Sequence, residues 1–305
     1  MGAFINSFFM LERPPMHELS RSGIDLLAQV TVVVVTYESA HCLEALSTLL
    51  LECPHVTFVD NASNDGSAAL ARQRFPHAQV IALERNIGFG AANNRALDQV
   101  RTPYALLLNP DCEIGAEALA VLVQEAQHFP DAAIIAPQLV NRSGEPDLSY
   151  RWPLTEWSSR GPVAVAPTCV GFVCGAAMLF VMANMKGADR FDERFFLYYE
   201  DDDLCLRLFK LRKSLIVVPR VTALHRSRGS VKGRSRLKSE YLRGYHHAQS
   251  KIKFIQKHLG VDRAARQRKR LILQTTLLTP LRLLSPPRLI GRHLGRLKGL
   301  LDLKP

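Results

Sequence analysis

The sequence predicts an α/β protein with a mostly parallel sheet. Three apolar runs of β-forming residues are continuous rather than alternating, which is typical of strands buried on both faces; they lie at 30–35, 56–59 and 104–108. Helical patterns separate and follow these runs, at 41–51, 67–75 and 115–129. Strands and helices in alternation favour a parallel sheet, and a chain of 305 residues can bury a full core.

A polar loop follows each apolar run, at 36–39, 60–67 and 109–111. Ligands of parallel sheets bind outside the carboxyl ends of the strands, so these loops are expected to line one crevice. Asp60, at a strand end, can accept a hydrogen bond from a ring N–H of a nucleotide base. The Gly-x-Gly loop within 84–94 leads into a helix, and with Arg85 it can approach a phosphate-bearing ligand.

Asp111 and His225 are candidate metal ligands. Asp111 follows a buried strand with a single carboxylate. Metal–diphosphate sites need few protein ligands, because Mg²⁺ or Mn²⁺ keeps waters and takes oxygens from the phosphates. His225 follows the segment 217–224. A lone histidine is more often structural, so residue type alone leaves both roles of His225 open.

Four consecutive carboxylates at 200–203 directly follow the aromatic run 195–199. The apolar neighbours favour burial, and a carboxylate held at the edge of a core can be a base, a metal ligand or a charge at a helix N-terminus. The alternative is an acidic helix start beside a basic surface. If a helix begins at Glu200, Asp201 and Asp202 point about 100° apart, so only one of them can be the base.

The bulk composition is that of a globular protein, with 47% apolar and 22% charged residues. The six cysteines lack Cys-x-x-Cys spacing and favour a reduced, cytosolic protein. Residues 1–10 lack a basic stretch before an apolar one, so we expect no signal peptide. The uncharged segment 161–185 contains prolines and glycines, which favours a buried strand and loop over a membrane helix.

The net charge of +11 is concentrated at the C-terminal end. From residue 262 onward, eleven basic residues stand against two acidic ones, and leucines are interleaved among them. This pattern favours an anionic membrane surface as partner. Nucleic acid fits less well, because the segment is rich in leucine and has no aromatic stacking platform. A solvated pair of helices is the remaining alternative.

Together the motifs resemble glycosyltransferase family 2, with its nucleotide-sugar-binding, Rossmann-like GT-A fold, and most closely its bacterial rhamnosyltransferase-like branch. The resemblance covers roughly 29–258 and rests on seven pieces in order, each weak alone: 33–37, 59–67, 86–94, 107–111, 175–178, 191–207 and 225–230. The chain departs from the family at Glu38, where asparagine is usual, and at Asp202, where an apolar residue is common.

The resemblance implies site residues by position. It places the nucleotide and donor on Thr36, Tyr37, Asp60, Asn86, Gly88, Asn93 and Asn109. It places Gly175, Ala176 and Glu200 on the acceptor side, Mg²⁺ or Mn²⁺ on Asp111 and His225, and the catalytic base at Asp201.

The implied reaction is inverting transfer of a sugar from a nucleotide-diphosphate sugar, dTDP-rhamnose in this branch, to a hydroxyl of a glycan or lipid-linked glycan. Bacterial surface polysaccharide synthesis is the expected setting, with the enzyme cytoplasmic and peripheral at the inner face of the cell membrane. We expect an N-terminal extension over 1–27, a GT-A domain over 28–260, and a helical, basic amphipathic tail over 261–305. The tail is expected to dock on the anionic membrane surface, and no nucleic-acid partner is expected.

Three other functions are weighed against this one. A sugar-1-phosphate nucleotidyltransferase needs a glycine-rich basic loop after the first strand, and 36–39 is not such a loop. A nicotinamide oxidoreductase needs Gly-x-Gly-x-x-Gly at the same place, which is also absent. A non-enzymatic module that binds a membrane or nucleic acid explains the tail but leaves the carboxylate loops without a role.

Overall fold

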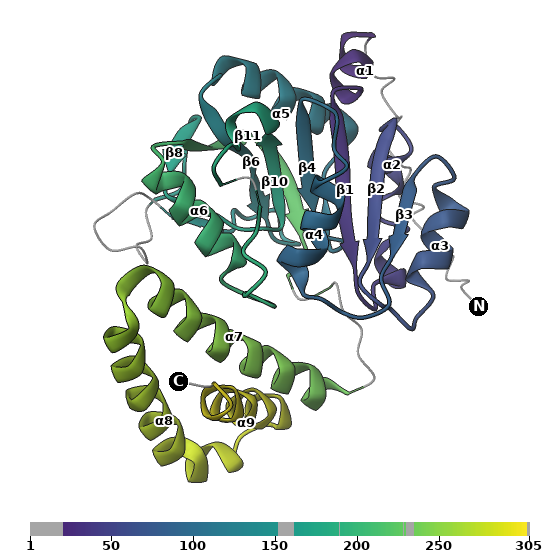
Figure 1. Ribbon diagram of the computed structural model, residues 1–305. Coiled ribbons are helices and arrows are strands. Elements are labelled where there is room, and N and C mark those ends of the chain that lie inside the picture. The colour runs from purple at the N-terminus through teal and green to yellow at the C-terminus, as the bar shows by residue number, and fades with distance from the viewer. Residues whose placement is uncertain (1–20, 152–161, 189, 228, 230–234, 304–305) are drawn as a thin grey trace, which may run out of the picture.

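The structure is a computed structural model that describes residues 21–151, 162–188, 190–227, 229 and 235–303. A twisted sheet with helices on both faces forms the larger part, and three long helices form a second group beside it (Figure 1). Of the expected N-terminal extension, only α1 (Arg21–Leu27) falls among the described residues.

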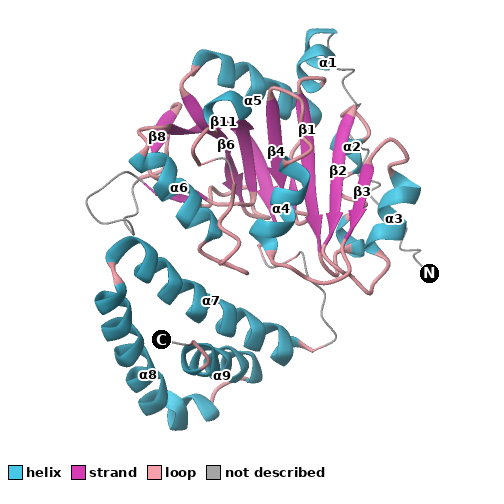
Figure 2. Ribbon diagram, viewed as in Figure 1, coloured by secondary structure: helices cyan, strands magenta, loops and turns pink. Residues whose placement is uncertain are grey.

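The central sheet has nine strands, in the order β3-β2-β1-β4-β10-β6-β11-β5, with β8 paired to β11 (Figure 2). Their bounds are β1 Val30–Thr36, β2 His55–Asp60, β3 Gln79–Ala82, β4 Tyr104–Leu108, β5 Cys112–Glu113, β6 Ala132–Val140, β8 Thr168–Val170, β10 Ala177–Val181 and β11 Ser214–His225. A separate pair joins β7 (Tyr150–Arg151) and β9 (Phe172–Val173).

The three apolar runs form β1, β2 and β4, which pair in parallel as predicted. Every residue of β1 is buried, and its alternate side chains enter two different cores: Val32 and Val34 on one face, Val33 and Val35 on the other. β10 lies antiparallel between β4 and β6. The parallel order resumes between β6 and β11. The sheet is therefore Rossmann-like, with one reversed strand at its centre.

Helices cover both faces of the sheet (Figure 1). One face carries α1, α2 (Ser47–Leu50), α3 (Ser67–Arg74) and α5 (Ala116–His128), and the other carries α4 (Phe89–Leu97) and α6 (Glu200–Lys210). Two short 3₁₀ turns are η1 (Ala40–Cys42) and η2 (Met182–Asn184).

The predicted helix at 41–51 is wrong in its geometry. Between Ala40 and Ser47 the backbone hydrogen bonds join residues three apart, so the segment is wound more tightly than an α-helix before α2 begins. With three residues per turn, Leu43, Leu46 and Leu49 fall on one side, and all three are buried in the core. A spacing of three residues between these leucines thus fits a 3₁₀ helix better than the α-helix, with 3.6 residues per turn, that the sequence predicts.

The uncharged segment that follows residue 161 forms β8, β9 and β10, as its prolines and glycines predicted. Among the helices of the described chain, none combines the length and the apolar character needed to cross a membrane. All six cysteines are free thiols.

The second group consists of α7 (Arg236–Leu259), α8 (Val261–Leu283) and α9 (Pro287–Leu301). It lies beyond the end of the sheet at which β1 and β2 finish (Figure 1). The chain turns from α7 into α8 at Gly260, where φ is +94°. Rather than extending away, α9 folds back along α7.

Glycines bring α9 unusually close to α7. A Cβ atom at Gly291, Gly295 or Gly299 would collide with a backbone carbonyl of α7, and one at Gly244 of α7 would collide with the carbonyl of Arg292. A small core seals the group and contains Ala248, Ile252, Ala264, Leu271 and Leu300. The position of α9 on α7 is therefore fixed by close backbone contact.

Candidate active site

The first part of the site is at the ends of β1 and β2, where Thr36 lies directly beside Asp60 in the parallel register. The Thr36 hydroxyl donates to one oxygen of the Asp60 carboxylate at 2.9 Å, and the backbone N–H of Ser63 donates to the other at 3.1 Å. Asp60 is only 4% exposed, and the next residue after Thr36, Tyr37, is half-buried. The carboxylate therefore has a fixed orientation at the mouth of the sheet.

Glu38 braces the loop that follows Asp60. Its φ of +53° is unusual for a residue other than glycine, and its backbone N–H donates to the Ser63 hydroxyl at 3.0 Å. Its carboxylate accepts from the N–H of Asn64 at 2.8 Å. The glutamate found where asparagine is usual in the family thus binds the 60–67 loop of its own chain.

Asn61 and Asn86 form an amide network that shapes the glycine loop. Asn86 Oδ1 accepts from Asn61 Nδ2 and from the Gly88 N–H, both at 3.0 Å. Asn61 Oδ1 in turn accepts from the N–H of Ile87 at 2.9 Å. The sequence resemblance assigned a role to Asn86 but none to Asn61, and only the position of Asn61 after a strand end could have indicated it.

Gly88 is required by both conformation and space. Its φ and ψ of +95° and 165° are open essentially to glycine alone, and a Cβ there would collide with the Phe196 carbonyl. That carbonyl accepts from the N–H of Phe89 at 3.0 Å, which joins the glycine loop to the aromatic run. Asn93 is buried inside α4, where its amide donates to the carbonyl of Phe89 at 3.0 Å.

The acidic run forms the first turn of α6, which begins at Glu200. The helix N-terminus favours negative charge on these residues. The two residues before it, Tyr198 and Tyr199, both have left-handed backbone angles, with φ of +68° and +67°. Such strain in consecutive non-glycine residues is typical of functional segments.

Asp201 and Asp202 have different surroundings. One oxygen of Asp201 accepts from the Gly175 N–H at 3.1 Å and the other from the Asp202 N–H at 2.9 Å. Burial, followed by the charge of Asp202, raises the pKa of Asp201 to about 6 from 3.8. Asp202 instead forms an ion pair with Arg151 at 2.7 Å. Of the two carboxylates that the sequence leaves open as the base, Asp202 is paired with a cation and Asp201 is not paired with one among the described residues.

Asp203 and Glu200 are buried beside them. Asp203 is fully buried and is held by Arg207 and His258, each at 2.8 Å, and by Lys257 at 2.5 Å. Burial, followed by the charge of Asp201, raises the pKa of Glu200 well above its usual range. The Oε2 atom of Glu200 is buried and makes no hydrogen bond to any described residue. Asp203 is therefore a structural anchor, whereas Glu200 has a carboxyl oxygen available for a ligand or water.

Gly175 and Ala176 connect Asp201 to the end of β4. A Cβ atom at Gly175 would be in ordinary van der Waals contact with the side chains of Phe89 and Asp201. The carbonyl of Ala176 accepts from the N–H of Asn109 at 2.9 Å. The Oδ1 atom of Asn109 is buried and makes no hydrogen bond within the described chain. Asn109 therefore lies near Asp201, and its amide oxygen remains able to accept a hydrogen bond from a ligand.

Asp111 and His225 converge because β5 pairs with the end of β11, which puts Cys112 opposite His225. The His225 Nε2 atom is 3.9 Å from Asp111 Oδ1. The Gly229 N–H donates to Asp111 Oδ2 at 2.8 Å, and the Gly229 carbonyl lies 2.7 Å from His41 Nε2. Within the described residues, no cluster of three or more His, Cys, Asp or Glu side chains could hold a metal ion. One carboxylate and one imidazole fit a divalent ion that takes its other ligands from phosphate and water.

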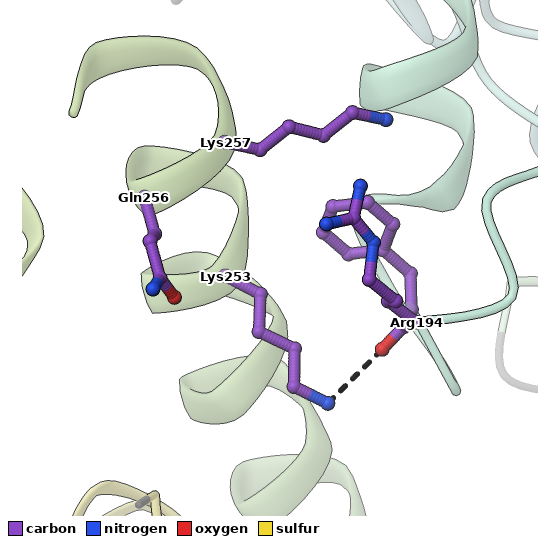
Figure 3. A pocket seen from close by; sticks show the side chains of 5 residues that line it. Arg194, Lys253, Gln256 and Lys257 are labelled. Carbon is purple, nitrogen blue, oxygen red and sulfur yellow. Dashed lines mark hydrogen bonds between the residues drawn. The ribbon is translucent and has the colours of Figure 1, made fainter. Parts of the chain in front are cut away.

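Helix α7 is tied to the segment that precedes α6. A groove of about 390 Å³ lies between them, lined by Arg194, Phe195, Lys253, Gln256 and Lys257 (Figure 3). Lys253 reaches across it to the carbonyl of Arg194 at 3.0 Å. The groove contains none of the predicted site residues, and its contacts serve to hold α7 in place. A further tie joins Ser250 to the carbonyl of Leu197 at 2.9 Å.

Comparisons with known proteins show which family the chain belongs to. The chain is 28% identical over 268 residues to the N-acetylglucosaminyl-diphospho-decaprenol L-rhamnosyltransferase of Mycobacterium tuberculosis, a match that covers 76% of this chain and 86% of that protein. It is 25% identical to the low-salt glycan biosynthesis hexosyltransferase Agl10 of Haloferax volcanii, over 60% of this chain and 62% of that protein.

A similar fold occurs in a mannosyltransferase of Pyrobaculum calidifontis, solved in complex with GDP-Man and Mn²⁺. The TM-score is 0.55 at 16% identity, and the match covers 90% of this chain and 88% of that one. Residues 31–188, just over half of the chain, match the sequence model of glycosyl transferase family 2. The chain therefore belongs to glycosyl transferase family 2, and its sheet has the GT-A form that the sequence predicted.

Proposed function

We propose that this enzyme moves a sugar from a nucleoside-diphosphate donor to an acceptor hydroxyl with inversion, and that Asp201 is the general base. The acceptor oxygen attacks the anomeric carbon opposite the departing diphosphate, and Asp201 takes the hydroxyl proton. The observation that carries this proposal is the raised pKa of Asp201, to about 6, in a carboxylate that is oriented by two backbone N–H groups. A base of this strength is ionised at neutral pH and still accepts a proton readily.

The donor residues follow from the fixed geometry at the strand ends. Thr36, Tyr37 and Asp60 would hold the base and ribose, because the Asp60 carboxylate is already oriented at the mouth of the sheet. Asn86, Gly88, Asn93 and Asn109 would shape the donor site, Asn93 through the backbone of α4 rather than by direct contact. The name of the mycobacterial relative supports rhamnose as the sugar. The donor that the family resemblance implies for this sugar is dTDP-rhamnose.

Asp111 and His225 would hold Mg²⁺ or Mn²⁺, since they place a carboxylate and an imidazole side by side. The bound ion would neutralise the charge that develops on the diphosphate. The chain's own contribution is to orient Asp111 through Gly229 and to keep His225 at the end of β11. On the other side of Asp201, Gly175, Ala176 and Glu200 would face the acceptor.

The acceptor is proposed to be a lipid-linked glycan of a bacterial surface polysaccharide, and α8 to be the surface that meets the membrane. Arg263, Arg266 and Arg270 share one face of α8 with three leucines further along: Leu273, Leu277 and Leu281, which are 61%, 71% and 65% exposed. This face offers cations to anionic headgroups at roughly 1 kcal/mol each, followed by leucines for the acyl boundary. The enzyme would then be cytoplasmic and peripheral, with a catalytic domain over 28–260 and a membrane-facing part over 261–305.

A panel of nucleotide sugars tests the proposed reaction directly. With Mn²⁺ present, the wild-type enzyme should slowly release nucleoside diphosphate from one donor, and Asp201→Asn should still bind that donor without transferring its sugar. Asp202→Asn is the matched control and should retain transfer. Release of nucleoside monophosphate or pyrophosphate would indicate a nucleotidyltransferase. An inactive Asp202→Asn beside an active Asp201→Asn would reject Asp201 as the base.

A further inference from the structure

The C-terminal helices α7 and α9 place basic side chains beside the segment that precedes Asp201. On α7, His247 packs against both strained residues of that segment, with ring centroids 5.6 Å from Tyr198 and 5.5 Å from Tyr199. The neighbouring His246 stacks on Phe196 at 4.3 Å. This face of α7 therefore contacts the turn at Tyr198 and Tyr199. Tyr199 is only two residues before Asp201 in the chain.

Arg292, Arg296 and Lys251 lie near His247. Lys251 follows it by one turn of α7, and backbone atoms of Arg292 and Arg296 pack on Gly244, one turn before it. After burial, which is the largest cause, the charges of all three contribute to lowering the pKa of His247 to about 4. Burial raises the pKa of Tyr198 and of Tyr199. The charge of Arg292 opposes this rise at Tyr198, and the charge of Arg296 opposes it at Tyr199. The close backbone approach at Gly244 and Gly295 fixes α9 against α7, so the two arginines are held at this place by the fold.

The positive charge of this cluster is not neutralised within the described chain. Nearby Arg243 pairs with Glu240 at 2.9 Å, whereas Arg292, Arg296 and Lys251 have no carboxylate within 4.0 Å among the described residues. Lys251 is half-buried, and burial together with Arg296 lowers its pKa. Arg292 is half-buried and Arg296 is exposed, so both side chains can reach a ligand beside this turn. Phosphate oxygens are suitable partners for arginine.

We propose that Arg292, Arg296 and Lys251 bind the phosphate groups that link the acceptor sugar to its lipid. This inference rests on the proposed function. In an acceptor with one sugar on a lipid diphosphate, a single sugar ring separates the attacking hydroxyl from the phosphates. The phosphate site must then lie next to Asp201, and the cations around His247 lie beside the turn that leads into it. The donor diphosphate is assigned elsewhere, beside Asp111 and His225.

The test compares Arg292→Gln/Arg296→Gln with a matched control, Lys269→Gln/Arg288→Gln, which removes the same charge from exposed positions on α8 and α9 that belong to no proposed site. Both are assayed in detergent without phospholipid, with a prenyl-diphospho-N-acetylglucosamine and with octyl N-acetylglucosaminide, which has no phosphate. Loss of two charge-assisted contacts should raise KM for the diphosphate acceptor by roughly 10²-fold. KM for the donor, KM for the octyl glycoside and kcat should stay within two-fold, and the control should match wild type.

Several outcomes would overturn the inference. An equal rise in KM for both acceptors would indicate a general positioning role, and a rise in KM for the donor would place the arginines at the donor diphosphate. A defect that is absent in detergent, and appears only when the assay is repeated with anionic vesicles, would make the cluster a phospholipid headgroup site. Binding of farnesyl diphosphate, measured by calorimetry without any turnover, separates this inference from the proposed function. Weaker binding by the Arg292/Arg296 variant would support the phosphate site even if no transfer occurs, and equal binding would reject it.

Discussion

Replacing Asp201 by asparagine should stabilise the protein at neutral pH while removing its activity. The folded state raises the pKa of Asp201 from 3.8 to about 6, which means that folding disfavours the charged form. Each ten-fold change in proton affinity corresponds to about 1.4 kcal/mol, so the ionised carboxylate costs the fold about 3 kcal/mol when fully buried and less for this half-buried side chain. Asparagine keeps the size and an acceptor oxygen for the N–H groups of Gly175 and Asp202.

The sign of the effect depends on pH. Above pH 6 the aspartate is charged in both states, and its cost to the folded state is fully present. Below about pH 4 it is protonated in both states, and the cost disappears. Asp201→Asn should therefore melt a few degrees higher than wild type at pH 7.5, and this advantage should vanish near pH 4.

Activity provides the second half of this prediction. The transfer rate of the wild-type enzyme should rise through about pH 6 and level off above it, as Asp201 loses its proton. Asp201→Asn should reduce the rate by roughly 10²–10⁴-fold, the usual contribution of a positioned base. A variant that melts lower than wild type at pH 7.5, or a wild-type rate that is flat from pH 5 to 8, would refute the account of this carboxylate.

Three further predictions concern other parts of the site. Gly88→Ala should lose about 1–3 kcal/mol of unfolding free energy and most donor binding in thermal shift, because only glycine adopts its backbone angles; Gly115→Ala, where a Cβ meets open space, should behave as wild type. Asp111→Asn should abolish the Mn²⁺-dependent part of donor binding in calorimetry, whereas Glu113→Gln should retain it; equal binding by both would reject the metal site. Leu277→Ser/Leu281→Ser should lower sedimentation with anionic vesicles without lowering the melting temperature, and unchanged sedimentation would reject α8 as the membrane-facing surface.

The sequence predicted the sheet because burial on both faces produces continuous apolar runs, as in β1. It did not predict that β10 runs antiparallel between β4 and β6, since a short apolar strand has no intrinsic direction. The segment around Leu43 was assigned the wrong winding because leucines three residues apart fit an α-helix approximately and a 3₁₀ helix better.

The sequence predicted that polar loops at strand ends form the site. It did not predict which of the carboxylates at 200–203 pair with cations. Arg151, the partner of Asp202, and His258, one partner of Asp203, are both distant from these carboxylates in the sequence. The charges and leucines of the tail predict a membrane-facing segment but not its position in the fold. Its glycines at every fourth position, which set α9 against α7, carry no charge or hydropathy signal and were therefore overlooked.

The most direct test of the central claim is the anomeric configuration of the product, measured by proton NMR after transfer from the donor that the panel identifies. We expect the anomeric configuration to be inverted relative to the donor, with product formed by wild type and Asp202→Asn but at most in trace by Asp201→Asn. A retained configuration, or full product formation by Asp201→Asn, would contradict inverting transfer with Asp201 as the base.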